Sequence, residues 1–425
     1  MLAAQARVAP VVQDEVQYAL GTITRIALFI SYAFAATLPH SFQLVEALAF
    51  VATTALCAVV VRRDPWLNQV LITYCLGVIV TAIYIWVGYV NGAPRVATGQ
   101  IFFVYIIAPL MWIMMGTAAI QLMGLRGTIR MLLWLTCGAL VTVAAFFILF
   151  FQVGRGAVEF LSADANINVN DGFAAANILV YGSLIFLTGA VFAQPAVIPG
   201  KWGRAILPGA LAVCALTSGR SALILSIPVG LLIGALMRPR GGTIDERGRR
   251  RNPVLSLVLV ALLGVAVLAA LDFFLASIDL FVILERFFDK IASGGGSERV
   301  EQSVALWEGF IDSRGLGIGH GKGVFYIRSN IYPWRYEVMP LATLVHAGLI
   351  GLIAYMAPFI LYGRKFLQRM SAGQVRPEDV YMLGGFASVT LAAATNPYIE
   401  SFVFLWMYFL PVMAIAIAPV DRRAA

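Results

Sequence analysis

Runs of apolar residues, each long enough to cross a lipid bilayer, occupy most of this 425-residue chain. A bilayer core takes about 20 residues of apolar helix, so each run predicts a membrane span. Hydrophobic residues make up 60% of the chain and charged residues only 12%, about half the charged fraction of an average soluble domain. Soluble and disordered proteins cannot carry this much apolar surface. We therefore predict an all-α, polytopic membrane protein.

Twelve segments fit this length and predict 12 transmembrane helices. They are residues 21–38, 42–61, 67–90, 100–121, 131–151, 173–193, 202–216, 221–237, 254–275, 341–363, 380–395 and 398–418. The expected organisation is nine helices in residues 1–275, a long loop with short amphipathic helices at 276–340, and three helices with a cytoplasmic tail in 341–425. The first run lacks a small-residue cleavage site, so we interpret it as a retained helix rather than a signal peptide.

Basic residues set the predicted orientation. With the N-terminus inside the cell, most of the 30 Lys and Arg residues fall in cytoplasmic segments, as the positive-inside rule requires. Both termini are then cytoplasmic, and the loop at 276–340 faces the periplasm of a bacterial inner membrane. The net charge of +8 and the basic cluster at 247–251 are interpreted as anchoring to anionic lipid headgroups, and no nucleic-acid partner is expected.

The long loop carries local patterns of its own. Residues 281–291 have helical spacing and are expected either to lie along the membrane surface or to extend the ninth helix. After three glycines, an apolar stripe recurs at the spacing of a second short helix; its residues are Val300, Val304, Trp307 and Ile311. We expect this stripe to pack against the protein, which leaves Arg299 and Gln302 to face a ligand.

Residues 315–323 have glycine at every second position and read Gly-Leu-Gly-Ile-Gly-His-Gly-Lys-Gly. A plain turn is the favoured interpretation. The alternative is a segment whose backbone N–H groups bind an anion. It is not a nucleotide-binding Walker loop, because Gly323 follows Lys322 and no strand precedes the segment.

Ionisable residues within or beside apolar spans are rare and indicate function. Arg220 opens the eighth helix at its outer boundary. It either reaches lipid phosphate at the interface or binds a ligand, and its planar fork of donors suits a phosphate. We favour the ligand, and we expect Asp272 or Glu400 to pair with Arg220.

Histidine and cysteine are scarce. The chain has only His40, His320 and His346, and its four cysteines lie in apolar runs. No spacing typical of a metal site, of a disulfide framework or of a Ser-His-Asp triad is present. No metal or other cofactor is expected.

Four motifs, taken in order, resemble the O-antigen ligase/polymerase superfamily of bacterial envelope glycosyltransferases. They are the Ser-Arg helix start in Leu216-Thr-Ser-Gly-Arg-Ser-Ala-Leu, the segment Ser297-Glu-Arg-Val-Glu-Gln-Ser-Val-Ala-Leu-Trp, the glycine-rich segment that runs on to Phe325, and Gly348-Leu-Ile-Gly. The resemblance covers residues 216–351, about a third of the chain. The remaining helices agree with the family only in number and hydropathy.

The resemblance implies a polyprenyl-pyrophosphate-linked glycan as donor and a hydroxyl of a second glycan as acceptor, with no metal. By resemblance, Arg220 and Arg299 belong to the donor site. Fixed positive charge there stabilises the pyrophosphate leaving group as it gains charge. The other expected substrate-binding residues are Arg286, His320, Lys322 and His346.

Ligases of this family have a His, usually followed by Asn, just before the tenth helix, where this chain has Glu337. Some polymerases of the superfamily have a Tyr-Glu pair there, as in Tyr336-Glu337. A carboxylate whose pKa is raised at a dry interface can deprotonate the acceptor hydroxyl, so Glu337 is the expected catalytic base and His346 the alternative. A salt bridge from Glu337 to Arg335 or Lys322 remains open.

The expected function is inverting, metal-independent polymerisation of undecaprenyl-pyrophosphate-linked repeats into O-antigen, capsule or exopolysaccharide. A chain-length regulator is a further expected partner, beside the donor, the acceptor and the lipid bilayer. Two alternatives are ligation of the glycan to lipid A core or another acceptor, and solute transport by a 12-helix permease. Transporters usually show internal repeats and charges near the membrane midplane, whereas here the charges lie at the outer boundary.

Overall fold

The computed structural model describes residues 2–161, 166–170, 173–218, 220–237 and 297–416. Within these ranges the chain is almost entirely helical, with one antiparallel pair of short strands, β1 (Asn166–Asn170) and β2 (Phe173–Asn177). The predicted ninth span, Asp272 and Arg286 lie outside the described residues.

In the part of the chain that the structure describes, five stretches of helix are long and apolar enough to cross a membrane. They are Tyr18–Thr37 of α1 (Leu2–Thr37), α2 (Gln43–Val60), α3 (Pro65–Val90), the stretch Arg95–Gln152 and α12 (Met339–Ser371). The stretch Arg95–Gln152 consists of α4 (Arg95–Phe102), a π-helical turn η1 (Phe103–Ile107) and α5 (Ala108–Gln152). The prediction of a helical protein with several apolar spans is confirmed, and the total of 12 spans stays a prediction.

The stretch Arg95–Gln152 contains both the fourth and the fifth predicted spans. At 58 residues it is far longer than the roughly 20 that one crossing needs. Its backbone leaves the helical region at Gly124, with φ 68° and ψ 170°. Glycine adopts a positive φ without steric cost, so the helix can change direction at Gly124, which lies between the two predicted spans.

Two predicted spans are wrong in their first third. Residues Phe173–Asn177 form strand β2, and α6 begins only at Val180 and ends at Ala193. The twelfth span begins with two 3₁₀ turns, η4 (Tyr398–Glu400) and η5 (Phe402–Phe404), before α14 (Trp406–Ala414). Apolar composition does not distinguish helix from other buried backbone, and the polar groups of Tyr398 and Glu400 bind partners from other segments.

The remaining elements are shorter than a full span or lie at its ends. They are α7 (Gly203–Thr217), α8 (Ser221–Leu236), α11 (Ser297–Asp312), α13 (Pro377–Ala393), and the 3₁₀ turns η2 (Arg155–Val158) and η3 (Pro195–Val197). α6 is buried along its whole length and packs against α8 and α13. Glycines at these contacts let the backbones approach closely: a Cβ on Gly230 would meet the backbone of Gly189, which belongs to α6.

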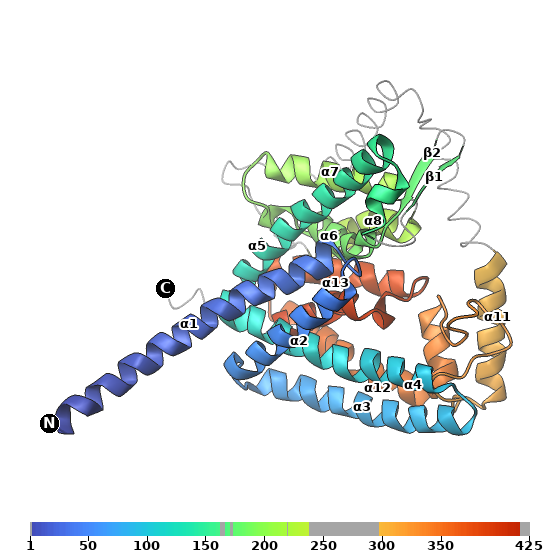
Figure 1. The fold of residues 1–425 in the computed structure, drawn as a ribbon, viewed down its shortest axis with the longest axis horizontal. Coiled ribbons are helices and arrows are strands. Elements are labelled where there is room, and N and C mark those ends of the chain that lie inside the picture. Colours follow the sequence, from blue (N-terminus) through green and yellow to red (C-terminus); the bar gives the residue numbers. More distant parts are fainter. Residues whose placement is uncertain (1, 162–165, 171–172, 219, 238–296, 417–425) are drawn as a thin grey trace.

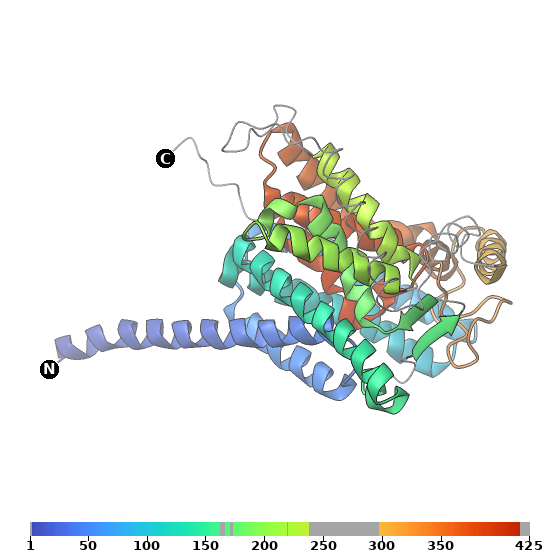
Figure 2. The same cartoon turned by 90° about the horizontal axis from the view of Figure 1, so that it is seen from above.

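α11 lies at one end of the helical bundle, beside the ends of α4 and α12, and the N-terminal part of α1 extends from the opposite end (Figures 1 and 2). α11 packs on α12, and α12 packs along α3. We call this side the α11 end of the bundle. Most residues of the candidate site lie there.

Candidate functional site

The glycine-rich segment 315–323 lies between α3 and α12. The N–H of Ile318 donates to the carbonyl of Val345 (2.7 Å), and the N–H of Gly319 donates to that of His346 (3.0 Å). These two carbonyls accept from the segment where α12 is interrupted at Gly348, which has φ 61° and ψ −169°. The segment is therefore inserted into a break in a long apolar helix.

Glycine is required in this segment by close backbone contacts. Gly315, Gly317, Gly319 and Gly321 all have positive φ, and a Cβ on Gly319 would meet the backbone of Gly88 in α3. The N–H of His320 donates to the carbonyl of Tyr84 at 2.9 Å. Three successive N–H groups are thus bonded to carbonyls of α12 and α3, so the alternative in which they bind an anion is not supported.

His320 and His346 lie together in the protein interior. Both side chains are buried, and their ring centroids are 5.7 Å apart. His320 Nε2 forms a hydrogen bond of 2.7 Å with the hydroxyl of Tyr355. Burial, together with the nearby His346, lowers the pKa of His320 well below its ordinary value. His320 is consequently neutral at physiological pH, which gives it no charge with which to attract a phosphate.

Arg299 and Glu337 are in direct contact, although 38 residues separate them. Arg299 Nε donates to Glu337 Oε2 at 2.8 Å, and Arg328 Nη2 donates to Oε1 at 2.6 Å. Among the described residues, Glu337 therefore forms ion pairs with Arg299 and Arg328, and the suggested partners, Arg335 and Lys322, do not take these positions.

Gln302 was expected to face a ligand, but its side chain is buried. Its Oε1 accepts from the N–H groups of Glu337 (2.7 Å) and Val338 (3.0 Å), just ahead of α12. These are donors that a helix start leaves without backbone partners. Gln302 therefore fixes Glu337 and the beginning of α12 to α11.

The apolar stripe of α11 is exposed, contrary to expectation. Val300, Val304, Trp307 and Ile311 are each at least 50% exposed, whereas Ala305 and Leu306 are fully buried. The covered face is the one with small residues: a Cβ on Gly309 would meet Val324 of the loop before α12 and would also touch Val345 of α12. Helical spacing identified the residues that share a face, but not which face is covered.

Arg220 is the N-cap residue of α8, as predicted, and its Nη1 donates to the hydroxyl of Tyr398 at 2.8 Å. Tyr398 begins the turn η4, which ends at Glu400. Glu400 accepts a hydrogen bond from Tyr105 (2.8 Å), and its Oε2 is 4.0 Å from Arg335 Nε. The turn η4 is thus in contact with both Arg220 and Arg335, and among the described residues Glu400 forms its ion pair with Arg335.

Glu400 is buried and precedes the apolar helical segment that starts at Phe402. Burial raises the pKa of its carboxyl group, and Arg335 and the hydrogen bond from Tyr105 partly oppose this shift. A buried carboxyl group with a positive partner is an arrangement often found at functional sites.

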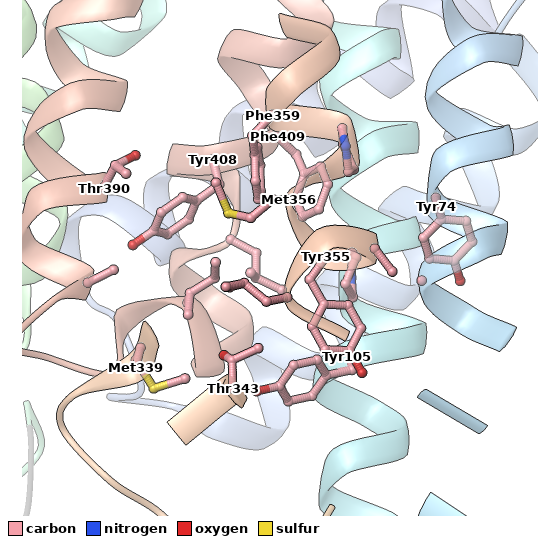
Figure 3. A pocket seen from close by; sticks show the side chains of 18 of the residues that line it. Tyr74, Tyr105, Met339, Thr343, Tyr355, Met356, Phe359, Thr390, Tyr408 and Phe409 are labelled. Atoms are coloured by element: carbon pink, nitrogen blue, oxygen red, sulfur yellow. The ribbon is translucent and has the colours of Figure 1, made fainter. Parts of the chain in front are cut away.

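An apolar cavity of about 530 Å³ borders this turn. It lies between α3, η1, α12, α13 and the last helix, and it is lined mainly by aromatic, aliphatic and proline side chains. Figure 3 shows Tyr105 beside Tyr355 and Thr343 at one end, and Phe359 and Phe409 farther along. Tyr105 lines the cavity and also donates to Glu400, and we call the end of the cavity at Tyr105 its polar end.

Tyr105 owes its position to the π-helical turn η1. Such turns insert an extra residue into a helix and are frequent at functional sites. The Tyr105 ring lies 4.9 Å from that of His320 and 5.3 Å from that of Tyr355. No sequence pattern marked this turn, because Tyr105 is one aromatic residue in an apolar run.

The structure brings the predicted residues into three groups at the α11 end. Arg299 contacts Glu337, Arg220 joins the turn that holds Glu400, and His320 lies beside His346. Lys322 is exposed. Arg328, Tyr105 and Tyr398 were not singled out from the sequence, and Arg335 was considered only as a partner of Glu337, whereas it pairs with Glu400.

Among the described residues, no group of three or more His, Cys, Asp or Glu side chains could hold a metal ion. Comparison with protein-family models, characterised proteins and solved structures gives no match to this chain. The likeness to the glycosyltransferase superfamily accordingly rests on the sequence motifs alone.

Proposed function

We propose that this protein is an integral-membrane glycosyltransferase that polymerises polyprenyl-pyrophosphate-linked repeat units into a surface polysaccharide. The observation that carries the proposal is an apolar cavity whose polar end lies at a turn joining Arg220 and Arg335. An amphiphile with an apolar chain and a doubly charged phosphate head has the complementary distribution of properties.

The cavity suits the lipid part of such a donor. Its volume of about 530 Å³ lies in the range of about 300–1,000 Å³ typical of small-molecule sites. Pro109, Met356, Phe359, Phe386 and Phe409 contribute to its lining. An unsaturated hydrocarbon chain loses no hydrogen bonds on entering such a space, and the burial of its surface favours binding.

Arginines at the α11 end suit the pyrophosphate. Guanidinium groups bind phosphate oxygens in a bidentate manner and keep their charge at any physiological pH. In the reaction proposed, an acceptor hydroxyl attacks the anomeric carbon, the bond from that carbon to the phosphate oxygen breaks, and the lipid pyrophosphate leaves. Arg220, Arg299 and Arg335 stabilise the charge that develops on this leaving group.

Glu337 is the proposed base, and its present contacts suggest how it is controlled. Both carboxylate oxygens accept hydrogen bonds from arginines, Arg299 and Arg328. An oxygen that one arginine has released is the better proton acceptor, because the positive charge that stabilises the ionised form has moved away. Transfer of Arg299 from Glu337 to the donor phosphate would free Oε2, so that donor binding prepares the base.

The proposed location is a bacterial inner membrane, with both termini in the cytoplasm and the α11 end toward the periplasm. The apolar helices and the positive-inside distribution of the sequence support this orientation.

The test is the length of lipid-linked polysaccharide made by cells that carry single variants. Arg220→Ala and Arg299→Ala should each shorten the product to one or a few repeats, while Glu337→Gln should prevent elongation without preventing donor binding. Arg95→Gln, an exposed arginine at the start of α4, is the charge-matched control. Wild-type lengths in both arginine variants would contradict the proposal. Glycan found on lipid A core would instead indicate ligation, and solute uptake by vesicles without glycan synthesis would indicate transport.

A further inference from the structure

The ion pair between Arg335 and Glu400 is the loosest at the α11 end. Arg335 Nε lies 4.0 Å from Glu400 Oε2, and Nη2 donates to the Glu400 carbonyl at 3.4 Å. The two arginines on Glu337 lie at 2.8 and 2.6 Å. Charge-assisted hydrogen bonds are normally about 2.7–2.9 Å long. Arg335 also lies over the ring of Tyr332, 5.4 Å from its centroid, so its contact with Glu400 is a weak one that a better acceptor can replace.

Glu400, in contrast, is firmly placed. Its Oε1 accepts from Tyr105, its turn is buried, and the neighbouring Ile399 lines the apolar cavity. Were Arg335 to move away, the carboxylate would keep one neutral donor and lose its closest positive charge. An ionised carboxylate in such surroundings is costly, and the usual response is to bind a proton.

Other titratable or charged groups surround this pair. Tyr105 faces Glu400 from η1, Arg328 acts on it from the loop before α12, and Tyr398 in the same turn carries the contact to Arg220. From the connection between α1 and α2, His40 bonds to Ser401 at 2.8 Å. Burial and the charge of Arg335 lower the pKa of His40 to about 4, so His40 is neutral and does not compensate Glu400.

We propose that Arg335 leaves Glu400 to bind the diphosphate of the lipid-linked donor, and that Glu400 then takes up one proton from the medium. This inference rests on the proposed function and adds a step to it. Arg335 lies two residues before Glu337, in the segment that Gln302 fixes to α11. The step requires the Arg335 side chain to move from Glu400 toward the end of the cavity that Tyr105 lines.

Proton uptake is measured by calorimetry of the full-length protein in lipid nanodiscs. The probe is geranylgeranyl diphosphate, titrated at pH 7 in two buffers that differ in ionisation enthalpy. The phosphate's own change in protonation is the same in every variant, so the quantity of interest is the difference between proteins. We expect wild type to take up more protons per ligand than Glu400→Gln. Glu308→Gln, which removes an exposed carboxyl group of α11, should match wild type.

A second variant tests the inference independently, in case Glu400→Gln does not fold. Tyr105→Phe removes the hydroxyl donor to Glu400, so that more of the carboxyl group is protonated before ligand arrives and proton uptake should be smaller. Arg335→Gln should weaken binding about tenfold, the usual cost of losing a charged hydrogen bond, and should also remove the extra uptake. Arg95→Gln should change neither the affinity for the ligand nor the proton uptake.

The outcomes separate the inference from the function on which it rests. If the lipid diphosphate binds but uptake is equal in wild type and Glu400→Gln, the inference is wrong and the proposed function stands. If geranylgeranyl diphosphate does not bind at all, the proposed function fails as well. Inorganic pyrophosphate should bind more weakly than the lipid form; equal affinity would show that the cavity does not bind the lipid chain, which contradicts the proposed function on which the inference rests.

Discussion

The N–H of Gly319 donates to the carbonyl of His346 across the break that Gly348 makes in α12. Through this bond and its neighbours, a loop segment becomes part of the packing between α3 and α12. The contact depends on two backbones approaching where no side chain fits, which makes it open to a direct test.

Replacing Gly319 with alanine should destabilise the protein by about 1–3 kcal/mol. The new Cβ would meet the Gly88 backbone, at a residue whose φ is +97°. Gly92→Ala is the matched control, because its φ is +86° and nothing lies within 4 Å of a Cβ there. Thermal unfolding in detergent measures both. Equal losses in the two variants would mean that backbone strain alone, and not the contact with α3, sets the cost.

Gln302→Ala should cost about 1–3 kcal/mol, because it leaves the N–H groups of Glu337 and Val338 without their acceptor. It should also slow elongation, since Glu337 loses its fixed position. The neighbouring Glu301 is exposed, and Glu301→Ala should change neither stability nor product length. Unfolding curves and product lengths are compared across the three proteins. A Gln302→Ala protein as stable as wild type would contradict the role given to this side chain.

Two adjacent carboxyl groups at the start of α13 should respond very differently to removal of charge. Asp379 is buried and bonds to Arg369 and Arg376, whereas Glu378 pairs with Arg126, which is 81% exposed. Asp379→Asn should cost about 3–5 kcal/mol, as breaking buried ion pairs does, and Glu378→Gln at most about 1 kcal/mol. Chemical denaturation of both variants provides the comparison, and similar losses would show that burial of the Asp379 cluster does not matter.

Acidification should weaken the fold through its two loop histidines. Burial lowers the pKa of His40 to about 4 and that of His320 well below 6.5. The unfolded chain therefore binds more protons than the folded one once the pH falls below about 6.5, and stability is lost in that direction. Unfolding temperatures from pH 7.5 to pH 5 should decrease. The double variant His40→Gln, His320→Gln should show a flatter profile, and an unchanged slope would exclude these histidines as the cause.

The sequence predicted the helical class and most helix positions because apolar runs of bilayer length have few other structures available. It could not predict which side of α11 is covered. The spacing of Val300, Val304, Trp307 and Ile311 defines a common face, but contact with α12 is made by the face of Ala305 and Gly309, where small residues permit close packing. That choice depends on the partner helix, which periodicity does not describe.

From the sequence, site residues could be identified only beside the apolar spans, where a charged side chain is rare. Arg220 and Arg299 stood out because an arginine beside apolar spans is costly unless it has a function or a partner. Tyr105 and Tyr398 did not stand out, since a tyrosine in an apolar run is ordinary. Their roles follow from a π-helical turn and a 3₁₀ turn, and these depend on tertiary contacts rather than on local composition.

The break at Gly348 divides α12 into parts that belong to different layers of the molecule. The part from Leu349 to Ser371 is about 35 Å of helix at 1.5 Å per residue, enough to cross a bilayer core of about 30 Å by itself. The preceding turns are joined by hydrogen bonds to the glycine-rich segment and, through Gln302, to α11. Gly348 consequently marks where α12 changes from a membrane span to a support for the loop, and a chimeric protein that exchanged residues 297–347 would also have to keep Tyr84 and Gly88 of α3, which the glycine-rich segment contacts.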